Sequence, residues 1–511
     1  MRKREALLLG AIAVLSLPSC GKKEEASKPI DMDKIAFTSS DIVQTSFGGL
    51  GVEWGAYEDT DKIVDGGWEL ILQHMDRLAP SRIRLMVSYD WFCQDFNDHG
   101  NNDKSDDTWT YNFANKYMRN AIQILEYCET HHIDVAFGAW NVVADSLSPL
   151  LDTWKMMDEV TSDPRWATIT GDVLDYLVNR KGFDCIKWFV NSNEPNWVGS
   201  RGSSKNWSNT YAKWEQGVKN VRAKLDSLGM SKIKIIGGDT TGIEGTREYF
   251  TGIAKGIPDK VGDYGCHLYV NNIMIDRGDP LTQIQNISQE VKDIDPGFGI
   301  TRPVNVWEAG LLDGKTALDC QTMINTGAYG VRMADFTLQC LAGGINGIAY
   351  WDFDDAMHFM YSSVATTPKE WGMFSSLADA SGNKQELRPW FHSSCLMTHL
   401  FQKGNRIYCP PQTDSAKDNL FRSIGTRSPD GKTGGFLAIN KGARPVTKTF
   451  YFDEGIEGET LYLYRFADKT YRLGEDGYII PNEILENTSL GKKLTLEIPT
   501  NSAYVVANRM L

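Results

Sequence analysis

Ile186–Asn191 (IKWFVN) is a short, mostly apolar run that leads directly into the polar turn Ser192–Asn196 (SNEPN). Short runs of apolar and aromatic residues that are bounded by turn residues indicate buried β-strands. Seven more runs of this kind lie on either side of it in the first three quarters of the chain. The eight expected strands are Phe47–Trp54, Ile83–Ser88, Val135–Trp140, Ile186–Asn191, Ile233–Gly237, Tyr264–Val270, Val304–Glu308 and Ile348–Asp352.

Longer amphipathic runs separate these strands and predict helices. Among them are Val64–Leu78, Tyr117–His131, Thr168–Arg180, Tyr211–Leu228, Pro280–Ile294 and Cys320–Leu341. Eight strand-then-helix units in about 310 residues match a (β/α)8 TIM barrel in count and size. The alternative is an open, doubly wound sheet, which ordinarily has a glycine-rich phosphate turn after its first strand. Gly48-Gly49-Leu50-Gly51 lacks the third glycine of that turn, which favours the barrel.

The sequence changes in character after the eighth unit. Pro389–Gln402 predicts a helix, and the strand-like runs that follow are separated by Gly, Asp, Pro and Asn turns. These runs are Phe436–Ile439, Thr447–Phe452, Leu461–Phe466, Leu494–Ile498 and Ala503–Ala507. The expected fold class is therefore α/β: a (β/α)8 barrel over residues 45–403 followed by a C-terminal all-β sandwich over residues 404–511.

Composition and charge exclude some classes of function. The chain has 511 residues, with 53 Lys and Arg against 66 Asp and Glu, so its formal net charge is −13. This charge repels phosphate backbones and no local basic patch offsets it, so no nucleic-acid partner is expected. The 15 Trp, 20 Tyr and 21 Phe residues supply flat rings that suit core packing and also stacking on the apolar faces of sugars.

The N-terminus predicts export. Met1–Arg4 carries three positive charges, and the apolar run Ala6–Leu17 is too short to span a membrane. Pro18-Ser19-Cys20 then resembles a bacterial lipobox, in which Cys20 is lipidated and becomes the mature N-terminus. We expect a signal peptide over residues 1–20, a tether over residues 21–44, and an exported lipoprotein held at the outer membrane, facing either the periplasm or the cell surface. An ordinary signal peptide with an incidental cysteine is the alternative.

No motif in the sequence predicts a cofactor or a metal. The other eight cysteines form no CxxC pair and no Cys/His cluster with zinc spacing. The acidic stretch Asp95–Asp107 and the group Asp352, Asp354, Asp355 and His358 show no recognisable ligand register. Gly310–Thr316 is one residue short of a P-loop, and neither GxSxG nor HExxH occurs.

Two glutamates stand where barrel enzymes place their chemistry. The C-terminal ends of barrel strands form the active face. Glu194 follows the fourth expected strand and Glu308 ends the seventh, so the two carboxyl groups can face each other across a sugar ring. Glycosidic cleavage needs such a pair, one acid to protonate the leaving oxygen and one carboxylate to meet the anomeric carbon. A separation of about 5–5.5 Å gives retention of configuration.

Asn193-Glu194-Pro195 together with Glu308 resembles clan A of the retaining glycoside hydrolases over residues 47–355. The resemblance implies that Glu194 is the acid/base and Glu308 the nucleophile. It also implies supporting roles for four other positions. Arg84 would steady the nucleophile, Asn193 would bind the sugar 2-hydroxyl, Tyr269 of the His267-Leu268-Tyr269 run would contact the nucleophile, and Trp351 would be the platform under the sugar at the cleavage site.

The resemblance does not single out one family. Families 5, 30 and 39 share parts of the pattern, and a C-terminal β-sandwich favours families 30 and 39. At the third strand, where several of these families have a histidine, this chain has Trp140-Asn141. Trp140, Asn141, Glu53 and Trp54 are further candidates for lining the sugar site. For each supporting residue a purely structural role, such as an ion pair or core packing, is the alternative.

The sequence therefore predicts a retaining glycoside hydrolase that acts on β-type linkages of poly- or oligosaccharides outside the cytoplasm. One alternative is a cell-surface glycan-binding lipoprotein on a barrel without catalysis. Another is a transglycosidase that uses the same two glutamates. The sequence does not indicate the sugar, exo or endo action, or the oligomeric state.

Overall fold

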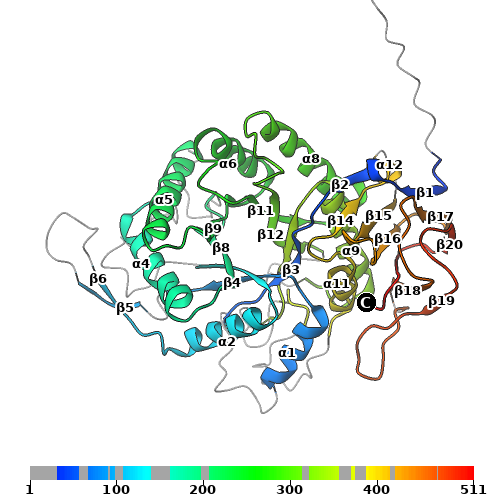
Figure 1. Cartoon of the computed structure of the whole chain (residues 1–511), viewed down its shortest axis with the longest axis horizontal. Coiled ribbons are helices and arrows are strands. Elements are labelled where there is room, and N and C mark those ends of the chain that lie inside the picture. The colour runs from blue at the N-terminus through cyan, green and yellow to red at the C-terminus, as the bar shows by residue number, and fades with distance from the viewer. Residues whose placement is uncertain are drawn as a thin grey trace, which may run out of the picture.

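The structure of the protein is a computed structural model, and it describes residues 31–56, 67–89, 93–97, 108–139, 161–196, 207–313, 321–355, 370–374, 387–414, 420–468 and 470–511. A barrel of strands and helices forms one side of the molecule, and an all-β domain that contains the C-terminus packs against it (Figure 1). The expected fold class is confirmed.

A sheet of parallel strands forms the barrel wall, in the order β10-β11-β12-β13-β3-β4-β7-β8-β9. Two of these nine segments share one position, because β9 pairs with β8 while β10, three residues further along the chain, pairs with β11. The eight strand positions of a barrel are thus filled, and the fifth strand is broken at Ile236–Gly237. The strands are β3 (Gly49–Glu53), β4 (Arg82–Val87), β7 (Asp134–Ala139), β8 (Ile186–Val190), β9 (Lys234–Ile235), β10 (Gly238–Thr241), β11 (Tyr264–Val270), β12 (Val304–Leu311) and β13 (Gly347–Tyr350).

Helices cover the outside of the barrel wall (Figure 1). They are α1 (Gly67–Leu78), α2 (Lys116–Thr130), α4 (Pro164–Leu174), α5 (Trp207–Ser227), α6 (Ile243–Gly256), α7 (Asn272–Arg277), α8 (Asp279–Lys292), α9 (Gly327–Ala342) and α11 (Pro389–Leu400). Side-chain caps begin several of them. The side chain of Asn115 accepts from the Tyr117 N–H at the start of α2, and Thr326 accepts from Tyr329 at the start of α9. Such caps satisfy N–H groups that have no partner within the helix.

Helix α6 was not among the helices expected from the sequence. It begins after Gly242 without a side-chain cap, and its interior glycines lower helix propensity. The packing explains two of them. A Cβ at Gly245 would lie 2.1 Å from Nδ2 of Asn196, and a Cβ at Gly252 would lie 2.4 Å from the Tyr211 ring. This helix is therefore stabilised by close packing against the loop after the fourth strand and against α5, and not by the helix propensity of its own residues.

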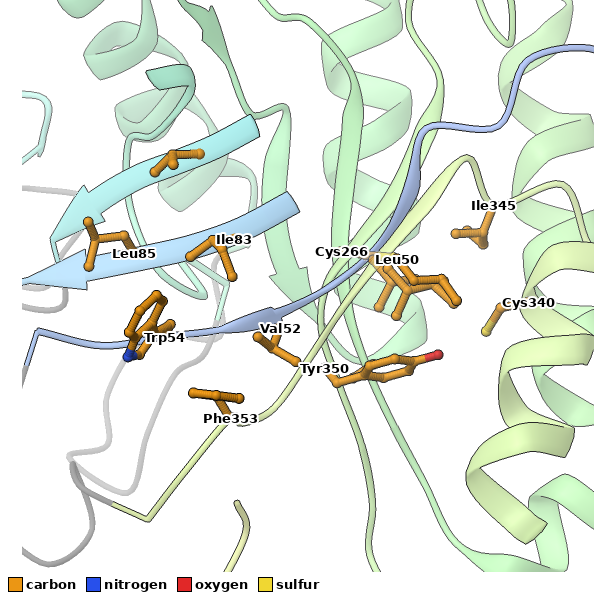
Figure 2. Close-up of a cluster of buried hydrophobic side chains, with 14 of the residues drawn as sticks. Leu50, Val52, Trp54, Ile83, Leu85, Cys266, Cys340, Ile345, Tyr350 and Phe353 are labelled. Atoms are coloured by element: carbon orange, nitrogen blue, oxygen red, sulfur yellow. The ribbon is translucent and has the colours of Figure 1, made fainter. Parts of the chain in front are cut away.

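A continuous apolar layer lies between the strands and the helices. Figure 2 shows part of it, with Leu50 and Val52 of β3, Ile83 of β4 and Tyr350 of β13 close together, and all four side chains are at most 1% exposed. Burying a side chain of this size contributes about 1.5–3 kcal/mol relative to leaving it exposed. The layer therefore holds the strand ends, and with them the polar loops, in fixed positions.

A buried polar network closes the N-terminal end of the barrel. Asp263 accepts hydrogen bonds from the Asn305 amide and the Trp307 indole, each at 2.7 Å, and from the Gly237 N–H. Arg82 donates to Asn305 at 2.9 Å. Burial raises the pKa of Asp263 to about 6, although the hydrogen bonds oppose the shift. This end of the barrel is filled, so a ligand must approach from the opposite end.

The all-β domain consists of two sheets. The larger has the order β19-β18-β21-β16-β15-β14-β2 and is antiparallel, and the smaller has the order β1-β17-β20. Apolar side chains such as Phe37, Phe436 and Phe450 fill the space between them. The strands are β1 (Lys34–Phe37), β2 (Ile42–Gln44), β14 (Arg406–Tyr408), β15 (Phe421–Arg427), β16 (Gly434–Asn440), β17 (Val446–Phe452), β18 (Thr460–Ala467), β19 (Glu483–Glu486), β20 (Leu494–Ile498) and β21 (Ser502–Ala507).

The structure corrects one expectation, because residues 34–44 are not part of a tether. Strand β1 pairs in parallel with β17, and β2 pairs with β14, so this segment belongs to the all-β domain (Figure 1). The physical reason is that Ile35 and Phe37 alternate with more exposed residues, and both are fully buried in the domain core. A four-residue strand that follows a charged segment gives too short a pattern to be recognised in sequence.

Two further observations concern the described residues as a whole. Their seven cysteines are free thiols, and each is buried. No helix among them has both the length and the apolar composition needed to cross a membrane.

A buried ion pair joins the two domains. Arg422 of β15 and Asp335 of α9 are 2.8 Å apart, with 1% and 0% of their side chains exposed. Arg422 also donates to the backbone oxygen of Asp276. A second interdomain pair, Arg77 with Asp476, lies at the surface, with about half of each side chain exposed.

We predict that Asp335→Asn lowers the free energy of unfolding by about 3–5 kcal/mol, because it leaves the Arg422 charge buried without its counter-charge. Asp476→Asn is the matched control and should cost at most about 1 kcal/mol, because water screens an exposed pair. Urea denaturation of both variants measures the difference. If the two variants lost equal amounts of unfolding free energy, the role assigned to the buried pair would be contradicted.

Candidate active site

Most of the sequence-predicted residues converge at the C-terminal end of the barrel. Glu53 is the last residue of β3, Arg84 lies in β4, and Asn193 and Glu194 follow β8. His267 and Tyr269 are in β11, and Glu308 is in β12. The strand register brings these positions to one end of the barrel, since all strands of the wall run in parallel.

The backbone places Glu194 in an uncommon conformation. Its φ is 42°, in the left-handed region, and its N–H donates to the backbone oxygen of Asp239 at 3.0 Å. Next to it, the Asn196 side chain pairs with both backbone groups of Thr241 at 2.5 and 2.9 Å. Left-handed conformations cost about 1–3 kcal/mol at residues other than glycine and persist only where the surroundings enforce them. Here the broken fifth strand enforces the direction of the Glu194 side chain.

Arg84 is the cation at the centre of the site and is fully buried. Its Nη1 donates to Oε2 of Glu53 at 2.5 Å and to Oε1 of Glu308 at 2.7 Å. Its Nη2 donates to Oδ1 of Asn193 at 2.7 Å and to Oδ2 of Asp239 at 2.8 Å. The guanidinium fork thus fixes side chains from four other strands. Since the Asn193 oxygen is used, its NH2 group is the end that can donate to a ligand.

The two glutamates approach each other closely. One carboxylate oxygen of Glu194, one of Glu308 and one ring nitrogen of His267 all lie within 4.8 Å of one another. Glu308 also accepts from the Tyr269 hydroxyl at 2.8 Å, and Glu194 is 2.9 Å from Nδ1 of His267. The Glu308 side chain is 6% exposed and that of Glu194 is 19% exposed. Carboxylate oxygens within 4.8 Å of one another agree with the short spacing of a nucleophile and an acid/base in a retaining glycosidase, about 5–5.5 Å between carboxyl groups, and not with the wider spacing of an inverting one.

The same three residues are near enough to hold a metal ion, but the state of His267 disagrees with that use. Burial disfavours its charged form, yet Glu308 and Asp239 outweigh burial and raise the pKa of His267 to about 10. A protonated imidazole donates from both nitrogens, so a metal ion would first have to displace a proton from it. The donor set therefore fits a hydrogen-bonded carboxylate pair better than a cation site.

Burial and charge also perturb the acids. Burial raises the pKa of Glu53 to about 8, with Arg84 opposing the shift and Glu308 adding to it. Burial likewise raises the pKa of Glu308 against the opposing effects of His267 and Arg84. The pKa of Asp239 is lowered, because Arg84 and His267 outweigh the effect of its burial. Perturbed pKa values that have specific charge partners, in a cluster at a barrel mouth, are typical of functional sites.

The aromatic residues predicted to line the sugar site lie in different environments. Trp351 directly follows β13 and is 8% exposed, and its backbone N–H donates to the backbone oxygen of Ala309, the residue after Glu308, at 2.8 Å. Trp54 does not line the site. It is 1% exposed and packs on Trp68 and Phe353 in the barrel core, as Figure 2 shows for Phe353, so its expected sugar contact is wrong. Trp140 and Asn141 lie outside the described residues.

Sequence reasoning missed two residues of the site. Asp239 in β10 contacts both Arg84 and His267, the latter with 3.0 Å between Oδ1 and Nε2. Its signal was present, because a carboxylate follows the strand-like run 233–237 after a single glycine. Trp371 packs edge-on against Tyr269, with 5.6 Å between ring centroids. No nearby strand pattern pointed to Trp371.

Comparisons with known proteins agree with this architecture. No protein-family model and no curated protein matches the sequence. A glycoside hydrolase family 30 subfamily 8 xylanase from Clostridium acetobutylicum superposes with a TM-score of 0.58 at 12% identity, covering 93% of this chain and 100% of the xylanase. A family 39 β-xylosidase from Caulobacter crescentus gives 0.58 at 12% identity, covering 93% and 99%.

A third solved structure, the endo-β1,6-glucanase BT3312, gives a TM-score of 0.59 at 13% identity, covering 94% of this chain and 96% of the glucanase. At such identities the likeness concerns the fold alone. The chain therefore has the barrel-and-β-domain fold of these solved structures.

We predict that Glu53→Gln flattens the pH dependence of stability. The folded state keeps the Glu53 proton up to a pKa of about 8, whereas the unfolded chain releases it near the ordinary value of 4.5. The contribution of Glu53 to wild-type stability therefore falls as pH rises between these values, by up to about 1.4 kcal/mol per pH unit. Glutamine has no proton to lose, so the variant should fall less steeply.

Urea denaturation at several pH values measures the two slopes. The exposed Glu497→Gln change on β20 is the matched control and should keep the wild-type slope. Parallel curves for wild type and Glu53→Gln would show that Glu53 is already ionised in the folded protein.

Proposed function

We propose that the protein is a retaining glycoside hydrolase that cleaves β-type linkages of poly- or oligosaccharides. The observation that carries the proposal is the Glu194–Glu308 pair, with carboxylate oxygens within 4.8 Å at the open end of a barrel. An acid and a nucleophile at this spacing are what double displacement at an acetal carbon requires. The shared fold supports the proposal, because a xylanase, a β-xylosidase and a glucanase are built on it.

In the first step Glu308 attacks the anomeric carbon while the bond to the leaving oxygen breaks. Glu194 gives its proton to that oxygen, so an alcohol departs and the sugar is held as an ester of Glu308. Arg84 and the Tyr269 hydroxyl bind the two oxygens of Glu308 and fix the direction of attack. Holding the reacting groups in place lowers the entropic part of the barrier.

In the second step water attacks the same carbon from the face that the leaving group vacated. Glu194, now a carboxylate, takes a proton from the water, the ester bond breaks and Glu308 is released as a carboxylate. Both residues are back in their starting states, and the released sugar keeps its anomeric configuration. The NH2 group of Asn193 is the donor to the sugar 2-hydroxyl, and Trp351 is the platform beneath the ring.

We also propose that the protein is exported and anchored by lipid at Cys20, as the N-terminal sequence predicts; residues 1–30 lie outside the described part of the chain. Polysaccharides are extracellular polymers, so export agrees with the proposed substrate class.

We predict that Cys20→Ala abolishes incorporation of labelled palmitate in a lipoprotein-processing bacterial host and moves the protein from the membrane fraction to the soluble fraction. Unchanged labelling would contradict the anchor and leave the glycosidase proposal intact.

For catalysis, we predict that Glu194→Gln lowers kcat by about 10²–10⁴-fold, the usual contribution of a general acid–base group. The assay uses residues 21–511 with aryl β-glycosides and with glucan, xylan, mannan and galactan chains. Glu308→Gly should lose turnover and regain it with added azide or formate, which enters from the opposite face and gives a product of inverted configuration. Glu497→Gln is the control and should keep full activity.

The outcome separates the proposal from its main alternative. A glycan-binding protein without catalysis would show no turnover in the wild type, and it would bind the same glycan with equal affinity in all three variants. Turnover that survives Glu308→Gly without any added nucleophile would rule out the assigned nucleophile.

A further inference from the structure

Asp239 occupies a position that the proposed chemistry does not yet use. It lies in β10, just after the break in the fifth strand, with a φ of 54° and a side chain that is 2% exposed. One of its oxygens accepts from Nη2 of Arg84 at 2.8 Å, and the other lies 3.0 Å from Nε2 of His267. Its backbone oxygen accepts the N–H of Glu194. One residue thus contacts the partner of each catalytic glutamate.

We infer that Asp239 is a positioning residue that holds His267 as a fixed, doubly protonated donor shared between the two catalytic carboxylates. The inference rests on the proposed function for its role in catalysis, while the charge and hydrogen bonding that it assigns to His267 are measurable without any substrate.

The carboxylates beside both ring nitrogens of His267 favour a ring with two protons. Its Nε2 faces Asp239, and its Nδ1 lies 2.9 Å from Glu194 and 3.3 Å from Glu308. A neutral imidazole has one N–H and one lone pair. In one neutral tautomer the Nε2 lone pair would lie 3.0 Å from the Asp239 carboxylate, and in the other the Nδ1 lone pair would lie 3.3 Å from the Glu308 carboxylate. Both contacts are repulsive in a buried site, and only the doubly protonated ring places an N–H beside a carboxylate on each side.

The charges around His267 agree with this state. The groups that face it are Glu194 from the loop after β8, Asp239 from β10 and Glu308 from β12. Arg84 and Glu53 lie beyond them in the same cluster, and Tyr269 is on the same strand. Burial works against protonation, but the carboxylates outweigh it, and the pKa of His267 rises to about 10.

The shared donor has a use in the reaction cycle. Before attack, Glu308 is a carboxylate and competes for the proton on Nδ1. Once Glu308 is esterified it is neutral and a weaker acceptor, so the same N–H is left for Glu194. Glu194 must then be ionised to take a proton from water, and the N–H of His267 is its hydrogen-bond donor at 2.9 Å. No proton leaves His267 in this account, and no heavy atom needs to move.

Asp239 makes this arrangement persistent. Without its negative charge, the carboxylates left beside His267 within the described part of the chain would be the two glutamates whose charge changes during the cycle. The ring would then be free to lose its proton when Glu308 is esterified. A carboxylate that touches neither sugar nor reacting atoms, and that is anchored by Arg84, keeps the ring charged and oriented throughout.

Nuclear magnetic resonance of protein labelled with nitrogen-15 at its histidines tests the inference. The His267 signal is assigned by its loss in His267→Gln. In the wild type, both ring nitrogens of His267 should show imidazolium shifts from about pH 5 to pH 9, whereas an ordinary histidine titrates near pH 6.5. In Asp239→Asn the same signal should titrate within this range.

Asp263→Asn is the matched control, since Asp263 is also a fully buried aspartate of the barrel but lies in the polar network at the N-terminal end. It should leave the His267 signal and kcat unchanged. Asp239→Glu, which keeps the charge, is the second variant in case Asp239→Asn folds poorly, and it should keep His267 charged. The wild-type titration alone decides the charge state if neither variant folds.

Kinetics supply the functional readout. Asp239→Asn should lower kcat by about 10²-fold, the usual effect of a misplaced catalytic group, with little change in KM. Its pH profile should gain an ionisation that the wild type lacks, and Asp239→Glu should recover part of kcat. A residue that serves only stability would lower the yield of folded protein without adding an ionisation.

The results separate the two proposals. If the wild type hydrolyses glycosides but its His267 titrates near pH 6.5, or if Asp239→Asn changes neither the titration nor kcat, the role of Asp239 is overturned and the glycosidase proposal stands. If no glycoside is cleaved although His267 stays charged, the proposed function fails and takes the catalytic role of Asp239 with it.

Discussion

The buried guanidinium of Arg84 is the interaction on which the site depends. A charge without access to water is tolerated only when counter-charges and hydrogen bonds surround it. Four side chains supply them, Glu53, Asn193, Asp239 and Glu308, each from a different strand position. Because the cation requires these partners, their geometry is fixed before any substrate arrives. The site is therefore preorganised by the need to neutralise a charge inside the barrel.

The break in the fifth strand places one of the partners of Arg84, Asp239, and also positions Glu194. Strands β9 and β10 close the barrel in two pieces, and the interruption lets Asp239 adopt a left-handed conformation. From there its backbone holds Glu194 while its side chain holds Arg84 and His267. An unbroken strand would send alternate side chains to the wall and to the interior, with no backbone oxygen free for the fourth-strand loop. An irregularity of the wall thus sets the position of the proposed acid.

The sequence predicted the barrel well because the period of its apolar runs follows directly from strand and helix geometry. Tyr264–Val270 matches its strand to the residue. Glu194 and Glu308 could be placed because barrel topology sends every strand end to one face. Three features depend on contacts between distant segments and were not predictable. Strand β1 needs β17 as a partner, Trp54 turns to the core because Trp68 and Phe353 enclose it, and Asp239 acquires its role only beside Arg84 and His267.

The charges of the site also agree with the proposal that one of its two glutamates is the acid/base and the other is the nucleophile. Arg84 and His267 as cations balance Asp239 and Glu308 as anions, and Glu53 stays neutral while its pKa is about 8. In the proposed mechanism the sixth group, Glu194, is the one that gives up and regains a proton. In that mechanism the set loses a negative charge when Glu308 becomes an ester, and transfer of the Glu194 proton to the leaving oxygen restores the balance. The alternation between acid and base therefore follows from keeping a buried cluster neutral, with Arg84 and His267 unchanged at every step.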